Sequence, residues 1–112
     1  MAQFSTSNYI KGYKFELDGK TWEYRAPGAG VTLELSKASR KSSELEEKVK
    51  KGTATKADKE EQTRLVELAF NFYNSILKDG TEDNSEVQAW LNDTPMDVIA
   101  AIVQDIQKAS EQ

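Results

Sequence analysis

The chain contains no cysteine and no histidine among its 112 residues. Without cysteine it can form no disulfide and has no thiol nucleophile. Without histidine it lacks the commonest general base and the commonest metal ligand. We therefore expect no enzymatic activity, no metal site and no cofactor. An enzyme built from this chain would have to rely on carboxylates, lysines and tyrosines alone.

Long apolar runs are also absent. The longest, Val98 to Val103, is far too short to span a bilayer, and residues 1–10 lack the basic-then-apolar layout of a signal peptide. The net charge is -4 and 30% of the residues are charged, which is typical of a globular domain with a charged surface and not of a nucleic-acid-binding protein. We expect one soluble domain over residues 1–112, located in the cytoplasm.

The clearest pattern that is present is an aromatic β-hairpin over residues 13–25. Two alternating apolar–polar runs flank Asp18-Gly19, a strong signal for a two-residue type I′ turn. This loop length predicts the cross-strand pairs Tyr13–Tyr24, Lys14–Glu23, Phe15–Trp22 and Leu17–Lys20. The aromatic pairs then share one face, which needs helices to cover it because a lone hairpin is marginal in water.

Apolar residues recur every three or four positions from Val31 onward, which predicts a helical body over residues 31–110. The first helix is expected to stop at Gly52, and its start also alternates, so a strand over residues 31–35 stays open. Segment 37–64 mixes charges of both signs and has few large apolar side chains, which predicts an exposed, protruding helical hairpin. The predicted fold class is α+β and mostly helical, with an N-terminal β-hairpin packed on a bundle of three to four helices.

The second helix is predicted over about residues 56–79. Its N-cap is expected within Thr53–Thr55, with Asp58 in its first turn. Its second half is the richest apolar stretch of the chain. Two shorter helices should follow, one containing Trp90 and one that starts at Thr94-Pro95, where a capping hydroxyl precedes a proline in the first turn.

The apolar arc of the second helix is wider than the stripe of an ordinary surface helix. Apolar side chains that a small domain cannot enclose mark an interface with another protein. The large side chains of this arc, together with the tryptophan of the next helix, are therefore the predicted protein-binding residues: Val66, Phe70, Tyr73, Leu77 and Trp90.

Three other patterns favour structure over chemistry. Gly28-Ala29-Gly30 lacks the Gly-Lys-Ser/Thr continuation of a phosphate-binding loop. The segment that starts at Asp79 begins like a calcium loop, but its sixth position is Asn84 and its twelfth is Trp90, so a polar turn is expected. The lysines and arginine of segment 40–51 alternate with glutamates, which favours a solvated helix face and no contact with nucleic acid.

The layout resembles the tail assembly chaperones of long-tailed bacteriophages, a family of small, mostly helical proteins. The similarity is carried by the hairpin Phe15–Tyr24, by the proline-containing connector Ala26-Pro27-Gly28 and by the closing helix from Thr94 to Ile106. The resemblance covers the arrangement of elements over most of the chain.

This resemblance implies a non-enzymatic role. Such proteins bind the tape-measure protein, keep its hydrophobic helices soluble and recruit tail-tube subunits in the cytoplasm of the bacterial host, and they are absent from the mature virion. It also implies self-association and, in many members, a frameshifted longer form. The alternatives are a small phage structural or head–tail connector protein, or another helical protein-interaction module.

Overall fold

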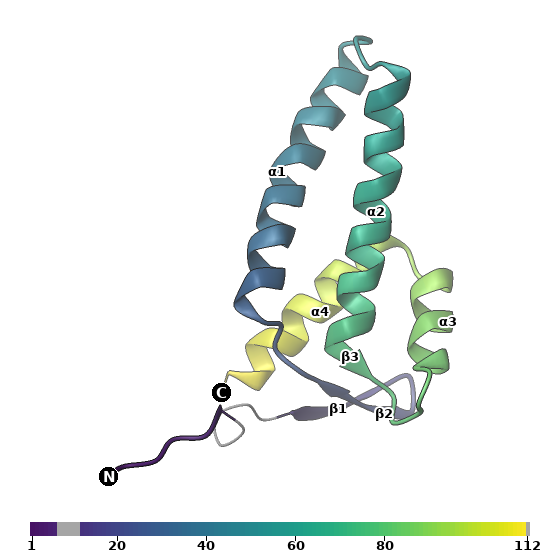
Figure 1. The fold of residues 1–112 in the computed structure, drawn as a ribbon. Helices are drawn as coiled ribbons and strands as arrows, with labels where there is room; N and C mark the ends of the chain where they lie inside the picture. The colour runs from purple at the N-terminus through teal and green to yellow at the C-terminus, as the bar shows by residue number, and fades with distance from the viewer. Residues whose placement is uncertain (7–11, 112) are drawn as a thin grey trace. The chain divides into compact units, whose positions relative to one another are not determined.

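The computed structural model of the chain describes residues 1–6 and 12–111. Within this part the fold is α+β and mostly helical, as predicted, with four helices and a small antiparallel sheet (Figure 1). The elements in chain order are β1 (Tyr13–Leu17), β2 (Lys20–Tyr24), α1 (Ala29–Lys50), α2 (Lys56–Ile76), β3 (Leu77–Lys78), α3 (Ser85–Asp93) and α4 (Met96–Ser110).

The chain divides into two compact units, where the sequence predicts a single domain. The sheet unit comprises Met1–Ala26 and Asn74–Gln112, and the hairpin unit comprises Pro27–Tyr73. The sheet unit holds all three strands with α3 and α4. The hairpin unit holds α1 and nearly all of α2, and it includes the charged segment 37–64 that the sequence predicts to be a helical hairpin.

The β-hairpin forms with the predicted register. Asp18 and Gly19 have φ values of 51° and 80°, and a type I′ turn requires positive φ at both positions. The observed pairs include all of those predicted: Tyr13–Tyr24, Lys14–Glu23, Phe15–Trp22 and Leu17–Lys20. The turn and the alternation therefore agree, and local sequence alone determines which side chains share a face.

The aromatic face of the hairpin packs within the sheet unit. Trp22 is 3% exposed, and its ring lies edge-to-face with those of Phe15 and Trp90, at centroid distances of 6.5 Å and 5.7 Å. Since Trp90 belongs to α3, the prediction that helices cover this face is confirmed. The indole N–H of Trp22 is buried without an acceptor among the described residues.

Helix α1 shows that the open alternative for residues 31–35, a strand, is wrong. The helix ends where predicted, since Gly52 adopts a positive φ of 72° and its N–H donates to the carbonyl of Val49 at 3.1 Å. Leu45 is the residue of α1 that is fully buried. The apolar stripe of α1 is therefore thin, in keeping with the few large apolar side chains that the sequence places in segment 37–64.

Helix α2 begins with the predicted cap. The N–H of Asp58 donates to the Thr55 hydroxyl at 3.1 Å, and the N–H of Thr55 donates to the Asp58 carboxylate at 3.0 Å. This reciprocal arrangement satisfies two backbone donors at the helix start. The hydrogen bond from the Thr55 N–H to the carboxylate holds the pKa of Asp58 below its usual value, with smaller contributions from the Thr55 hydroxyl and Lys48.

The predicted end of the second helix is wrong. Helix α2 stops at Ile76, and Leu77–Lys78 form β3 against β2. The N–H of Arg25 also donates to the carbonyl of Ile76 at 2.9 Å, just beyond that ladder. The physical reason is that the second edge of β2 presents backbone groups that need partners, and two extended residues supply them.

The start of α4 differs from the prediction in one detail. The helix begins at Met96, but Pro95 occupies the N-cap position and no side chain caps it. Thr94 is in extended backbone at the end of α3, so its hydroxyl does not serve as the expected cap. A proline at the helix start needs no partner for an N–H, which removes one of the orphan donors.

Candidate protein-binding surface

Three of the predicted binding residues share one face of α2. Val66, Phe70 and Tyr73 are separated by four and three positions, which brings their side chains into line on a helix. Val66 is 58% exposed, and Phe70 and Tyr73 are half-buried. The adjacent face of the helix is packed, since Leu65 and Phe72 are 7% and 8% exposed. Helix α2 therefore has a buried apolar face and beside it an apolar face that is partly in solvent.

Tyr73 gives this face an amphipathic side chain. Its ring lies 5.5 Å from that of Phe72 in an edge-to-face arrangement. Burial raises the pKa of the Tyr73 hydroxyl above its usual value, so the side chain is neutral at physiological pH. A half-buried tyrosine with a polar tip is a residue type enriched in protein interfaces.

The remaining two predicted binding residues lie in the sheet unit. Leu77 is 0% exposed and pairs with Tyr24 in the sheet, so it is unavailable to a partner. The prediction for Leu77 rested on continuing α2 by one more turn, which the strand β3 replaces. Trp90 is half-buried and packs on Trp22, so most of its surface is used within the sheet unit.

The sequence missed part of the exposed apolar surface of the hairpin unit. Val31 and Val49 follow the helical spacing of the stripe on α1, yet they are 42% and 47% exposed. Leu33 is 56% exposed and lies off that stripe, because it belongs to the alternating start of the helix. These residues, with Val66, are the large apolar side chains that the hairpin unit leaves in solvent.

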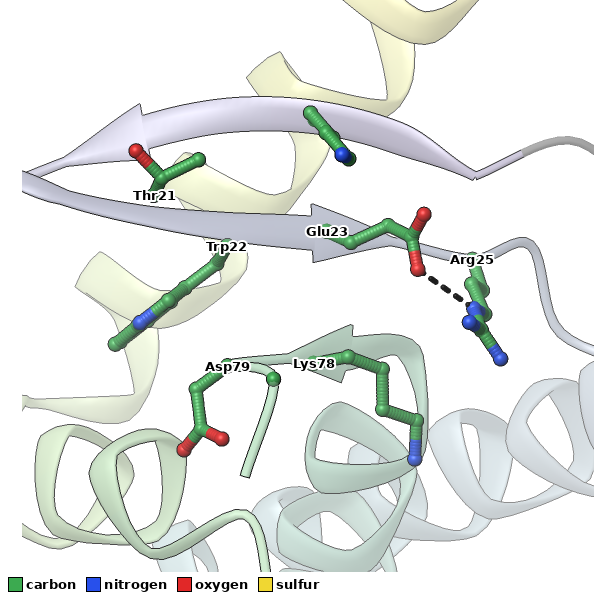
Figure 2. A pocket seen from close by; sticks show the side chains of 8 residues that line it. Thr21, Trp22, Glu23, Arg25, Lys78 and Asp79 are labelled. Carbon is green, nitrogen blue, oxygen red and sulfur yellow. Dashed lines mark hydrogen bonds and ion pairs between the residues drawn. The ribbon is translucent and has the colours of Figure 1, made fainter. Parts of the chain in front are cut away.

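A hollow of about 310 Å³ lies beside β3 in the sheet unit (Figure 2). Its charged lining residues include Lys14 and Lys78, and the carboxylate of Glu23 accepts a 2.8 Å hydrogen bond from Arg25. The Arg25 side chain is 59% exposed, and exposed ion pairs contribute little to stability. Figure 2 shows Glu23 and Arg25 directed at each other along one side of the hollow.

The loop that resembles the start of a calcium site forms a polar turn held by side-chain hydrogen bonds. The Asp79 carboxylate accepts hydrogen bonds from the N–H groups of Glu86 and Val87 at 2.8 Å and 3.1 Å, which caps α3. The side-chain amide of Asn84 likewise donates to the backbone carbonyls of Asn74 and Leu77. Within residues 1–6 and 12–111, no group of three or more acidic, histidine or cysteine side chains is placed to hold a metal ion.

Comparison with known proteins found no matching family model, no matching curated protein and no matching solved structure. The resemblance to tail assembly chaperones therefore stays a prediction from the layout of the chain. In the described part of the chain, no helix has the length and apolar character needed to cross a membrane.

Proposed function

We propose that this chain is a non-enzymatic tail assembly chaperone of a long-tailed bacteriophage, which acts in the host cytoplasm by binding the tape-measure protein and tail-tube subunits. The observation that supports binding is the exposed apolar face of α2, where Val66 is 58% exposed beside the half-buried Phe70 and Tyr73. The element layout that resembles the family supports the choice of partner.

The physical basis is helix-to-helix docking. An amphipathic helix binds another by laying anchors at positions i, i+4 and i+7 against it, and Val66, Phe70 and Tyr73 have this spacing. The surrounding surface of the hairpin unit is charged and includes the ion pairs Lys51–Glu47 and Arg64–Glu61. A charged outer surface keeps a complex with an apolar client in solution.

Co-expression tests this proposal. The partner to use is a candidate tape-measure protein, which is the long coiled-coil-rich reading frame expected downstream of this one. We expect the chain to raise the soluble fraction of that protein and to co-purify with it. V66D should abolish co-purification because it places a charge in the apolar contact. N71D, which adds a charge at an exposed position on another face of α2, is the matched control.

The outcomes separate the proposed function from its alternatives. If the solubility of the tape-measure protein is unchanged, the proposal loses its main support. Mass spectrometry of purified virions distinguishes a chaperone from a structural part, because a chaperone leaves before the particle is complete. Detection of the chain at structural stoichiometry in virions would favour the head–tail connector or structural alternative.

A further inference from the structure

Among the described residues, the edge of the sheet along β1 is unpaired. The strand order is β1-β2-β3, so β2 covers one edge of β1, and no strand of the described residues pairs with the other (Figure 1). An open edge presents backbone N–H and C=O groups that are available to another strand. The chain carries no proline in β1 to block that edge.

The turn geometry identifies which backbone groups face this edge. A β-turn closes with a hydrogen bond between its first and fourth residues, here Leu17 and Lys20, and the direction of bonding then alternates along the strand. Phe15 and Tyr13 therefore bond to β2, while the N–H and C=O groups of Lys14 and Glu16 point away from it.

An observed bond on the far side of β2 supports this alternation. In β2 the same rule directs the backbone groups of Thr21, Glu23 and Arg25 toward β3. The N–H of Arg25 does donate in that direction, to the carbonyl of Ile76 at 2.9 Å, and Glu23 pairs with Lys78 on that edge.

The outward edge of β1 is complementary to itself. The strand reads Tyr-Lys-Phe-Glu-Leu, so the central residue is Phe15 and opposite charges lie on either side of it. When a second copy runs antiparallel about Phe15, Lys14 lies opposite Glu16 of the second copy, and Glu16 lies opposite Lys14. The outward N–H and C=O groups of Lys14 and Glu16 then lie opposite those of the second copy, and each charged side chain lies opposite one of the other sign.

An apolar hollow of about 250 Å³ adjoins the same strand. It lies between β1 and α4, and its apolar lining is contributed by Tyr13, Phe15, Leu17, Ile102, Ile106 and Ala109. The three lining side chains from β1 are only half-buried. A second copy paired along β1 would add its own Tyr13, Phe15 and Leu17 to this face, with Phe15 opposite Phe15 and Tyr13 opposite Leu17 across the new ladder.

We propose that two copies of this chain pair antiparallel along β1, centred on Phe15, and join their sheets across a twofold axis. The two contact surfaces are then the same patch on each copy, which is the arrangement of most homodimers. This proposal rests on the β1 edge and does not depend on a role in tail assembly.

Charge reversal at the paired positions tests the proposal, with sedimentation equilibrium as the measurement. We expect the wild-type chain to dimerise. E16K and K14E each place like charges opposite one another at both contacts, and each should weaken dimerisation about tenfold, which is about 1.4 kcal/mol. An equimolar mixture of the E16K and K14E chains restores opposite charges at both contacts and should form a heterodimer. If the two variants dimerise with each other but not alone, their weaker self-association cannot be caused by a damaged hairpin.

Two further variants control for the location of the contact. E16P removes an outward N–H but no bond to β2, and proline is tolerated at such edge positions, so it should abolish the dimer while leaving the hairpin formed. K20E changes a lysine at the turn, outside the paired strand, and should leave the dimer intact. A wild-type chain that sediments as a monomer would overturn the proposal. So would a dimer that E16K and E16P leave unaffected, because its contact would then lie elsewhere on this chain.

Discussion

The side-chain amide of Asn84 donates a 2.8 Å hydrogen bond to the backbone carbonyl of Leu77. The same amide also donates to the backbone carbonyl of Asn74 at 3.0 Å, and the Asn84 side-chain oxygen accepts from the N–H of Asp79 at 3.0 Å. Asn84 is 8% exposed and has a positive φ of 57°. One buried side chain thus ties together the end of α2, the strand β3 and the start of α3.

Replacement of Asn84 should destabilise the sheet unit strongly. N84A leaves the buried carbonyl of Leu77 and the part-buried backbone groups of Asn74 and Asp79 without their side-chain partner, and we expect a loss of about 3 kcal/mol in the free energy of unfolding. Urea unfolding followed by tryptophan fluorescence measures it, because Trp22 and Trp90 both lie in this unit.

Two variants separate the contributions at Asn84. N84G also loses the hydrogen bonds but accepts the positive φ freely, so it should be about 1 kcal/mol more stable than N84A. N92A, at an exposed asparagine of α3, should unfold like the wild type. A loss below about 0.5 kcal/mol in N84A would contradict a structural role for this side chain.

The Asp79 cap predicts a dependence of stability on pH. Burial pushes the pKa of Asp79 up, but hydrogen bonds from Thr81, Val87 and Glu86 outweigh it, and the pKa is lowered from the ordinary value of 3.8. A carboxyl whose pKa is lowered by folding stabilises the protein above its unfolded pKa, and this contribution is lost as the pH falls through the folded pKa. The unfolding midpoint in urea should therefore drop between about pH 5 and about pH 2.

The neutral analogue provides the control for this pH dependence. In D79N the titrating group is gone, so the decline at low pH should be smaller than in the wild type. Amide hydrogen exchange at Glu86 and Val87, whose N–H groups donate to Asp79, should be faster in D79A. If the acid profiles of wild type and D79N coincide, the carboxylate does not hold this cap.

The Thr55 hydroxyl caps α2, and its removal should loosen the start of that helix. Because the hydroxyl accepts the N–H of Asp58, T55A should lower the stability of the hairpin unit by about 1 kcal/mol. Far-UV circular dichroism during thermal unfolding measures the loss. T55S keeps the hydroxyl and should behave like the wild type, and equal destabilisation by T55S would show that the methyl group matters instead.

Adjacent residues of α2 should respond differently to truncation. Leu65 is 7% exposed and Val66 is 58% exposed, so L65A should cost about 3 kcal/mol of folding stability. V66A should change stability by less than about 0.5 kcal/mol. Chemical denaturation of the two variants gives both values. A large loss in V66A would mean that Val66 is packed within this chain, and the α2 face proposed for partner binding would not exist.

Much of the candidate site followed from helical spacing. Val66, Phe70 and Tyr73 recur at four and three positions, and the structure places them on one face of α2. The prediction for Leu77 is wrong because its spacing from Phe70 also fits a helix, and no local signal marks the end of α2 before Gly80. The spacing of Val31 and Val49 predicts that they share a helix face, but it does not show whether another element covers that face. Their exposure could therefore not be predicted from the sequence.

Features whose partners lie close along the chain could be predicted from local sequence. The Asp18-Gly19 turn sets the hairpin register within a few residues, Gly52 ends α1 in its own left-handed backbone, and Thr55 with Asp58 starts α2. The departure of Leu77 and Lys78 from the helix into a strand depends instead on contacts with distant elements. Their partners are the edge of β2 and the amide of Asn84, which lie on other elements, and backbone groups take the conformation in which their hydrogen bonds are satisfied.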